Sequence, residues 1–228
     1  MTAVVIPARF NGPPGSGHGG YSAGLVAAAL GPSATVRLAA PPPLDTSMTL
    51  EDTGYGVRLM AGDTLVADAR AGRPELDVPP PPDLAAAARA SESYPGFVEH
   101  PFPTCFGCGP EHPDGLRIFP GPAGSDGLLA APWTPAPDLA SNGVVDSVYV
   151  WAALDCPSGF ACIPPMSMSV LATMTAEVEA PIHPGESYVI TAWPISHDGR
   201  KPRGGAAIHD ATGTRVAVAD TLWITPRS

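Results

Sequence analysis

The chain has 228 residues, which suits one large domain or two small ones. Its 25 glycines and 30 prolines disfavour a bundle of long helices, because an interior proline costs a helix roughly 3 kcal/mol. A hydrophobic content of 44% is still enough to build a core. The formal net charge of −10 excludes a generally basic surface for nucleic acids or anionic membranes.

No targeting signal or membrane span is predicted. The N-terminus lacks a basic start, and its apolar run at 3–6 is too short for a signal peptide. Two uncharged stretches, 11–36 and 156–176, are interrupted by Gly, Pro, Ser and Thr. Four cysteines do not make a disulfide framework in a chain of this length. We therefore expect a soluble, cytoplasmic protein that binds neither nucleic acid nor membrane.

The first segment predicts a helix followed by short antiparallel strands. A glycine-rich stretch, 11–20, leads into an Ala- and Leu-rich run, 21–30, which Gly31 and Pro32 terminate. A helix followed by a strand meander is an α+β order. The predicted strands are 35–39, 48–50, 57–60 and 64–69.

The composition changes after residue 71, and then the helix-and-strand pattern returns. Four consecutive prolines at 79–82 and two helical turns at 83–90 predict a semi-rigid linker with a short helix. A second helix is predicted at 144–154 and is ended by Pro157. The remaining predicted strands are 116–119, 128–133, 171–179, 187–195, 206–209 and 215–225.

Two pairs of similar segments occur in the same order. Residues 36–41 resemble 176–181, and residues 65–69 resemble 216–220. Two matches in one order indicate a duplication. We therefore divide the chain into an N-terminal half, 1–71, a Pro-rich linker, 72–104, and a C-terminal half, 105–228.

Three motifs resemble those of the hotdog thioesterases. Asn11 followed by His-Gly-Gly at 18–20 resembles a motif of thioesterases of the phenylacetate-pathway type. The segment 105–110, with Gly-Leu at 115–116, resembles a CxxCG…GL segment that often opens such domains. Residues 151–155 are similar to the helix that ends on the catalytic Asp. The resemblance implies a tandem, or double, hotdog protein of the acyl-CoA thioesterase superfamily, an α+β fold with two helix-plus-antiparallel-sheet repeats.

The resemblance also implies roles for particular residues. Asp155 would act as general base on water or as nucleophile. His18, Gly19 and Gly20 would form the oxyanion entrance, and Asn11 would orient the carbonyl or the water. Free amides at a helix start can stabilise a thioester oxyanion, and loss of one such donor typically costs about 2.7–4 kcal/mol. Because a thiolate leaves readily, a strong general acid is not required.

The two predicted helices carry complementary parts of a site. Ala27 lies nine residues after His18, and Asp155 lies nine residues after Asp146. The first helix thus has the His-Gly-Gly entrance without an acid, and the second has the acid without the entrance. In the resembled family each site combines the entrance of one subunit with the acid of the other. We therefore expect one composite site between the halves.

The same motifs have other interpretations. The stretch 15–20 also fits a dinucleotide fingerprint, although no parallel βαβ units are predicted, and a tight turn with a surface histidine is the simpler alternative. Asp155 is otherwise a solvated acid near a helix end, where the macrodipole disfavours it. Cys105 and Cys108 are half of a zinc site, and a turn with buried thiols is favoured over metal. Cys156 is a conceivable nucleophile without an evident base.

Arg200, Lys201 and Arg203 form the only dense basic cluster, in a predicted hairpin. They are either an ordinary charged turn or a contact for the phosphates of coenzyme A. We predict thioesterase-like hydrolysis of an acyl-CoA or related acyl thioester, with coenzyme A only as part of the substrate. The rival is a non-catalytic acyl-CoA- or lipid-binding module, and a flavin or nicotinamide enzyme ranks third. Each is compatible with a homo-oligomer.

Overall fold

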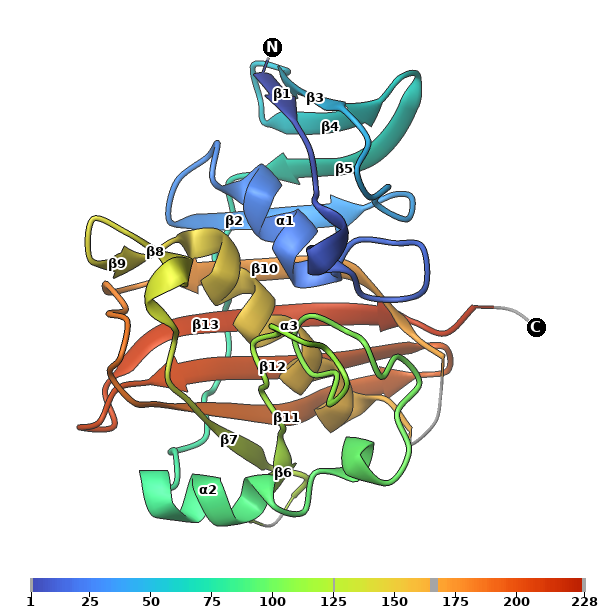
Figure 1. Ribbon diagram of the computed structural model, residues 1–228. Coiled ribbons are helices and arrows are strands. Elements are labelled where there is room, and N and C mark those ends of the chain that lie inside the picture. Colours follow the sequence, from blue (N-terminus) through green and yellow to red (C-terminus); the bar gives the residue numbers. More distant parts are fainter. Residues whose placement is uncertain (1, 125, 165–167, 227–228) are drawn as a thin grey trace.

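One antiparallel sheet connects the two halves of the chain (Figure 1). The computed structural model describes residues 2–124, 126–164 and 168–226. Within these ranges the strand order is β1-β3-β4-β5-β2-β10-β13-β12-β11-β7-β6. Its strands are β1 (Thr2–Val4), β2 (Ser33–Leu38), β3 (Met48–Asp52), β4 (Val57–Ala61), β5 (Thr64–Arg70), β6 (Gly121–Pro122), β7 (Leu129–Trp133), β10 (Val170–Val178), β11 (Tyr188–Asp198), β12 (Lys201–His209) and β13 (Arg215–Ile224).

Strands β2 and β10 pair at the centre and join the two halves. Thr35 lies opposite Thr175 in this pair, and their hydroxyl oxygens are 2.9 Å apart. Outward from the centre, β5 follows β2 on one side and β13 follows β10 on the other. These are the strands that hold the similar segments of the sequence, so the matched segments occupy mirrored places. The domain boundaries at 71/72 and 104/105 stay a prediction.

Two helices, α1 (Gly19–Ala27) and α3 (Ser147–Cys162), lie side by side on one face of the sheet (Figure 1). They run antiparallel, because Gly20 contacts Ala152 whereas Gly24, one turn further along α1, contacts Val148. Glycine permits this close approach: a Cβ on Gly24 would lie 2.8 Å from the Cβ of Trp151. The helix α2 (Leu84–Ser91), capped by Asp83, packs near β6 and β7.

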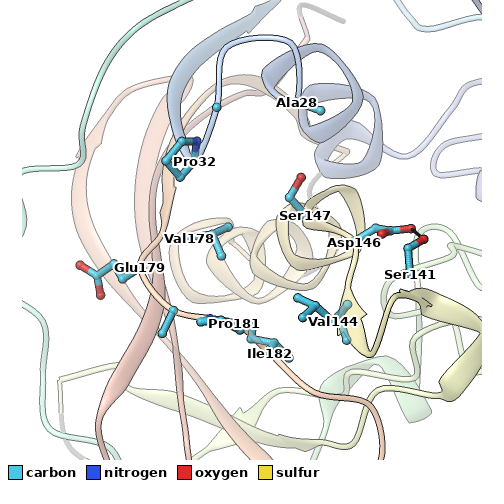
Figure 2. A pocket seen from close by; sticks show the side chains of 13 residues that line it. Ala28, Pro32, Ser141, Val144, Asp146, Ser147, Val178, Glu179, Pro181 and Ile182 are labelled. Atoms are coloured by element: carbon cyan, nitrogen blue, oxygen red, sulfur yellow. Dashed lines mark hydrogen bonds between the residues drawn. The ribbon is translucent and has the colours of Figure 1, made fainter.

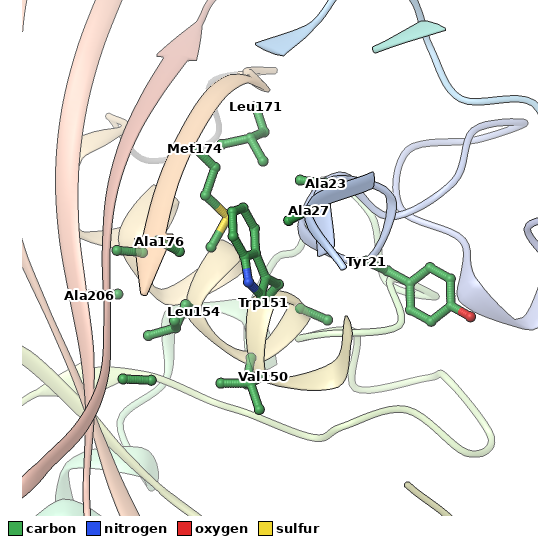
Figure 3. Packing of buried hydrophobic residues seen from close by; sticks show 14 of the residues in the cluster. Tyr21, Ala23, Ala27, Val150, Trp151, Leu154, Leu171, Met174, Ala176 and Ala206 are labelled. Carbon is green, nitrogen blue, oxygen red and sulfur yellow. The ribbon is translucent and has the colours of Figure 1, made fainter. Parts of the chain in front are cut away.

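The main core fills the space between these helices and the sheet. Figure 3 shows Trp151 of α3 packed between Met174 of β10 and the alanines of α1, Ala23 and Ala27. Trp151, Met174 and Leu154 are almost completely buried. Because full burial of one large apolar side chain is worth roughly 1.5–3 kcal/mol, this shared core stabilises both halves at once.

Most predicted elements are confirmed, but the strand at 116–119 and both ends of the second helix were predicted wrongly. Residues 116–119 form no strand of the sheet; Leu116 and Ile118 instead donate backbone hydrogen bonds to Phe106 and Gly107. The helix α3 does not end at Pro157 but continues to Cys162, since burial of its middle and end against the sheet outweighs the donor that proline lacks. It also begins later than predicted, because two short strands precede it: β8 (Ala140–Ser141) and β9 (Val144–Val145).

Among the described residues, no helix is long and apolar enough to cross a membrane.

Candidate active site

Asp155 lies in the middle of α3, opposite the N-terminus of α1. Its side chain is buried, and Oδ2 accepts a 2.5 Å hydrogen bond from the backbone N–H of Gly20. The other oxygen, Oδ1, is buried and has no hydrogen-bond partner among the described residues. Burial raises the pKa of Asp155 to about 6, although the nearby His18 opposes the shift. Asp155 is therefore a desolvated carboxyl group with one oxygen fixed and one unengaged.

His18 is the N-cap of α1 and connects the two helices. Its Nδ1 accepts a 3.2 Å hydrogen bond from the N–H of Tyr21, which satisfies one donor of the first turn. The same nitrogen lies 3.4 Å from Oδ2 of Asp155. Burial alone would lower the pKa of His18, but the charges of Cys105 and Asp155 outweigh this and raise it. His18 is buried, so the predicted alternative of a surface histidine is wrong.

A cavity of about 600 Å³ opens at this helix start. His18, Gly19 and Asp155 line it, and the N–H of Gly19 has no acceptor among the described residues. The Gly20 amide is not free in the same way, because it already binds Asp155. Most of the remaining lining is apolar: Leu38, Phe102, Phe160, Ile163, Leu171 and Trp223 contribute to it. The cavity thus combines one free amide, one carboxylate and a mainly apolar wall.

Three cysteines gather beside His18, which the sequence did not predict. The Sγ atom of Cys156 lies 3.1 Å from Nε2 of His18 and 3.7 Å from Sγ of Cys105. Cys108 lies beside them, and its Sγ is 3.3 Å from Nε2 of His100. Hydrogen bonds from the thiols of Cys108 and Cys156 lower the pKa of Cys105 well below its usual value. The histidines and cysteines come from distant parts of the sequence, and all of them line the cavity.

Asn11 lies outside the cavity lining. Its side-chain amide donates to the backbone oxygen of Thr104 at 2.8 Å, and its own backbone oxygen accepts from the N–H of Phe106. Asn11 therefore connects the glycine-rich loop to the segment that contains the cysteine pair, and its side-chain N–H is already engaged.

The basic cluster lies at the β11–β12 hairpin. Arg200 donates to the backbone oxygen of Thr225 at 2.9 Å, and Arg203 pairs with Asp220, whereas Lys201 is exposed. None of the three basic residues lines the cavity. Thr225 connects Arg200 to the rim, because its hydroxyl lies 2.8 Å from that of Ser169, a lining residue.

A second cavity of about 500 Å³ lies at the other end of the helix pair (Figure 2). Asp146, the N-cap of α3, lines it together with Ala28 at the end of α1. Figure 2 shows the Asp146 carboxylate turned toward Ser141, whose hydroxyl donates to it at 3.0 Å. The ninth residue of α1 is Ala27, in the place that Asp155 has in α3. At this end of the pair α1, as described, therefore offers no carboxylate to the start of α3.

Known protein families give no match by sequence, and no curated protein is similar. Solved structures do match. A TesB protein of Mycobacterium avium subsp. paratuberculosis is 11% identical with a TM-score of 0.65, covering 99% of this chain and 92% of that one. A conserved protein of unknown function with a hotdog fold, from Alicyclobacillus acidocaldarius, is 11% identical with a TM-score of 0.61, covering 99% and 93%.

A third similar structure, from Lactobacillus plantarum, is provisionally described as an oleoyl thioesterase. It is 10% identical with a TM-score of 0.60, and the match covers 100% of this chain and 96% of that one. Each of these matches covers almost the whole chain. In this chain α1 and α3 pack on one continuous antiparallel sheet. The chain therefore has the α+β double hotdog fold that was predicted.

Proposed function

We propose that this protein hydrolyses an acyl thioester at the cavity between α1 and α3, with Asp155 as the catalytic carboxylate. One observation carries the proposal: the buried Asp155 has an unengaged oxygen, and it lines a cavity that also holds the free Gly19 amide. Burial of an unpartnered carboxylate oxygen is costly, so its retention indicates a ligand or reactant that it meets. Similarity to a structure provisionally described as an oleoyl thioesterase agrees with this reaction class.

The residues divide the reaction between them. The Gly20 amide holds Oδ2 of Asp155, which leaves Oδ1 to accept a hydrogen bond from the attacking water. Asp155 removes a proton from that water as the oxygen attacks the thioester carbonyl. The carbonyl oxygen becomes an oxyanion that the N–H of Gly19, at the positive end of α1, stabilises. The C–S bond then breaks, giving a carboxylic acid and a thiol after proton transfer to the thiolate.

The apolar wall suits the acyl group. Phe160, Leu171 and Trp223 line the cavity beyond the polar end, and a volume of about 600 Å³ falls in the range of small-molecule sites. An apolar tail would therefore be desolvated while its carbonyl lies at the start of α1. The substrate proposed is an acyl-CoA or a related acyl thioester.

Replacement of Asp155 tests the mechanism. Asp155→Asn keeps the shape and the oxygen that accepts from Gly20 but removes the base, so we expect kcat to fall by a factor of about 10² or more with little change in acyl-CoA binding. Asp146→Asn is the matched control, because Asp146 lines the second cavity instead. The measurement is thiol release from acyl-CoA esters of graded chain length.

Two results would contradict the mechanism. Equal losses in Asp155→Asn and Asp146→Asn would mean that Asp155 has no special role. Saturable binding of acyl-CoA to the wild-type protein without any thiol release would replace the hydrolase with a non-catalytic acyl-CoA- or lipid-binding module.

We also propose that the basic hairpin contacts the phosphates of coenzyme A. Arg200 lies near the cavity rim through Thr225 and Ser169, and Lys201 is exposed beside it. Replacing Arg200, Lys201 and Arg203 together by Ala should raise the KM for acyl-CoA several-fold and weaken its salt dependence. A short thioester without phosphates should show no such change. The control is Arg58→Ala, an exposed arginine on β4, and an unchanged KM for acyl-CoA in the triple variant would contradict the contact.

A further inference from the structure

Two cysteines converge with one histidine at a single buried point, and a third cysteine packs beside them. Sγ of Cys105, Sγ of Cys156 and a ring nitrogen of His18 all lie within 4.8 Å of one another. Cys108 packs in the same buried cluster as Cys105 and Cys156. All four residues are buried, and no disulfide joins any of the cysteines.

We propose that this cluster binds a zinc ion through the thiolates of Cys105, Cys108 and Cys156 and through Nε2 of His18. Cys₃His is a common ligand set of structural zinc, and two of its thiolates usually come from a C-x₂-C pair such as 105–108. This site goes beyond the proposed hydrolysis, because neither Asp155 Oδ1 nor the Gly19 amide belongs to it.

The spacing of the donor atoms fits a tetrahedral ion. With a Zn–S bond of about 2.3 Å, two sulfur ligands of a tetrahedron lie about 3.8 Å apart. The observed separation of the sulfurs of Cys105 and Cys156 is 3.7 Å. Cys156 and His18 are 3.1 Å apart, so a small outward shift would place both at bonding distance from one ion.

The backbone of the C-x₂-C turn leaves room for these donors. A Cβ on Gly107 would lie 2.7 Å from Nε2 of His18 and 2.8 Å from Sγ of Cys156. Any side chain at this position would therefore displace two of the four donors. At Gly109 a Cβ would lie 2.4 Å from the backbone nitrogen of Cys105, so the turn itself also requires glycine.

The outer partners of the cluster also match those of metal ligands. A metal-bound histidine usually donates its second N–H to a carboxylate. With Nε2 on zinc, Nδ1 of His18 would carry the proton and donate to Asp155, 3.4 Å away, instead of accepting from Tyr21. His100 lies 3.3 Å from Sγ of Cys108, where its N–H can donate to a thiolate. The ion would reach the site through the cavity, which all four ligands line.

The bound ion would join three distant segments. His18 begins α1, Cys105 and Cys108 lie in the loop before β6, and Cys156 lies in α3. Zinc binding would displace the thiol protons and fix the loop against both helices, which lowers the free energy of the folded state only.

The test measures metal content and ligand type on the full-length, reduced protein. After removal of loosely bound metal, we expect one zinc per chain by elemental analysis. Replacement of zinc by Co²⁺ should give the intense visible bands of tetrahedral cobalt and a thiolate charge-transfer band. Cys105→Ser, Cys108→Ser and Cys156→Ser should each lose stoichiometric zinc, and Cys108→Ser should also weaken the charge-transfer band. Cys162→Ser is the control, because Cys162 is a buried thiol outside the cluster and should leave both readouts unchanged.

Several outcomes would overturn the proposal, and none depends on thioesterase activity. Reduced wild-type protein that takes up neither zinc nor cobalt excludes the site. A Cys105–Cys156 disulfide in protein isolated without reductant, with no metal uptake after reduction, would assign the cluster to redox chemistry. An unchanged cobalt spectrum in Cys108→Ser would show that Cys108 is not a ligand of the ion. The cobalt spectrum of the wild-type protein decides the question even where a serine variant does not fold.

Discussion

At the scale of single residues, the environment of Asp155 explains an acid that the helix pattern disfavours. The sequence placed Asp155 near a helix end, where the macrodipole disfavours an acid, but α3 continues to Cys162, so the cost of this acid is the desolvation of a buried carboxylate. The structure supplies the compensation from another helix, since the Gly20 amide at the start of α1 binds its Oδ2. A Cβ on Gly20 would lie 2.5 Å from the Cβ of Asp155, so the contact requires glycine. The interaction therefore depends on both residue types.

A second buried residue, His209, should make the free energy of unfolding depend on pH. Burial lowers the pKa of His209, and its Nδ1 has no partner among the described residues. As the pH falls below about 6.5, His209 therefore takes up a proton in the unfolded chain before it does so in the folded protein. The stability that the neutral, buried His209 allows above that pH is lost as the pH falls through the lowered pKa of the folded state. His209→Gln should show a smaller loss of unfolding free energy between about pH 7 and about pH 5 than wild type.

The measurement for His209 is urea denaturation at several pH values. His197→Gln is the control, because His197 is exposed at the β11–β12 hairpin. A pH profile of His209→Gln that parallels the wild-type profile would contradict the prediction.

At the scale of elements, the two central helices depend on each other. A helix of nine residues, such as α1, is marginal in isolation, and it contains three glycines. Its stability comes from packing against α3, where Gly20 and Gly24 allow the backbones to approach closely. The same contact carries Asp155 to the start of α1. Packing of α1 against α3 therefore also assembles the candidate site.

Gly24→Ala tests this contact. In an exposed helix the change would stabilise by about 1 kcal/mol, because alanine has the higher helix propensity. Here the new Cβ would lie 2.8 Å from the Cβ of Trp151 and 2.9 Å from the Cα of Val148. Overpacking of this kind typically costs about 1–3 kcal/mol, so we expect net destabilisation in denaturant titrations.

The control for Gly24→Ala is Ala88→Gly on the exposed face of α2, which should cost about 1 kcal/mol from propensity alone. Stabilisation of the protein by Gly24→Ala would mean that α1 and α3 are less closely packed than the structure shows.

At the scale of the whole molecule, the sheet and the helix pair cross the boundary between the halves. Strand β2 pairs with β10, and α1 packs on α3, so each half supplies part of the surface that buries the other. Folding units with such a shared core unfold together. The candidate site lies on this boundary, with its amide from one half and its carboxylate from the other.

We therefore expect one cooperative unfolding transition. All four tryptophans lie in the C-terminal half, and three of them, Trp133, Trp193 and Trp223, lie outside the contact that Trp151 makes with α1, so their fluorescence reports mainly on the C-terminal half. Hydrogen exchange of β4 and β5 reports on the N-terminal half. The two probes should give the same midpoint in denaturant. Separate midpoints would contradict this expectation and show that the two halves unfold as independent domains.

The sequence alone determined the features that depend on residues close together in the chain, namely most strands, the first helix and equivalent positions on the two helices. Alternating apolar residues predicted most strands, and the Ala- and Leu-rich run before Gly31 and Pro32 predicted α1. Counting nine residues from His18 and from Asp146 also predicted which helix keeps its acid, because equal helical positions follow from local spacing alone. Asp155, Gly19 and Gly20 were therefore candidates before any contact was known, and their catalytic roles stay a prediction.

Only the tertiary structure decided which distant groups meet. The continuation of α3 beyond Pro157 depends on burial, which overrides a local stop signal. The engagement of the Gly20 amide by Asp155 depends on how closely two helices pack. The thiols of Cys105 and Cys156 and the imidazole of His18 lie far apart in sequence, so no local spacing could bring them together. Their meeting follows from the strand order and the antiparallel helix pair, which place the start of α1, the C-x₂-C loop and the middle of α3 around one cavity.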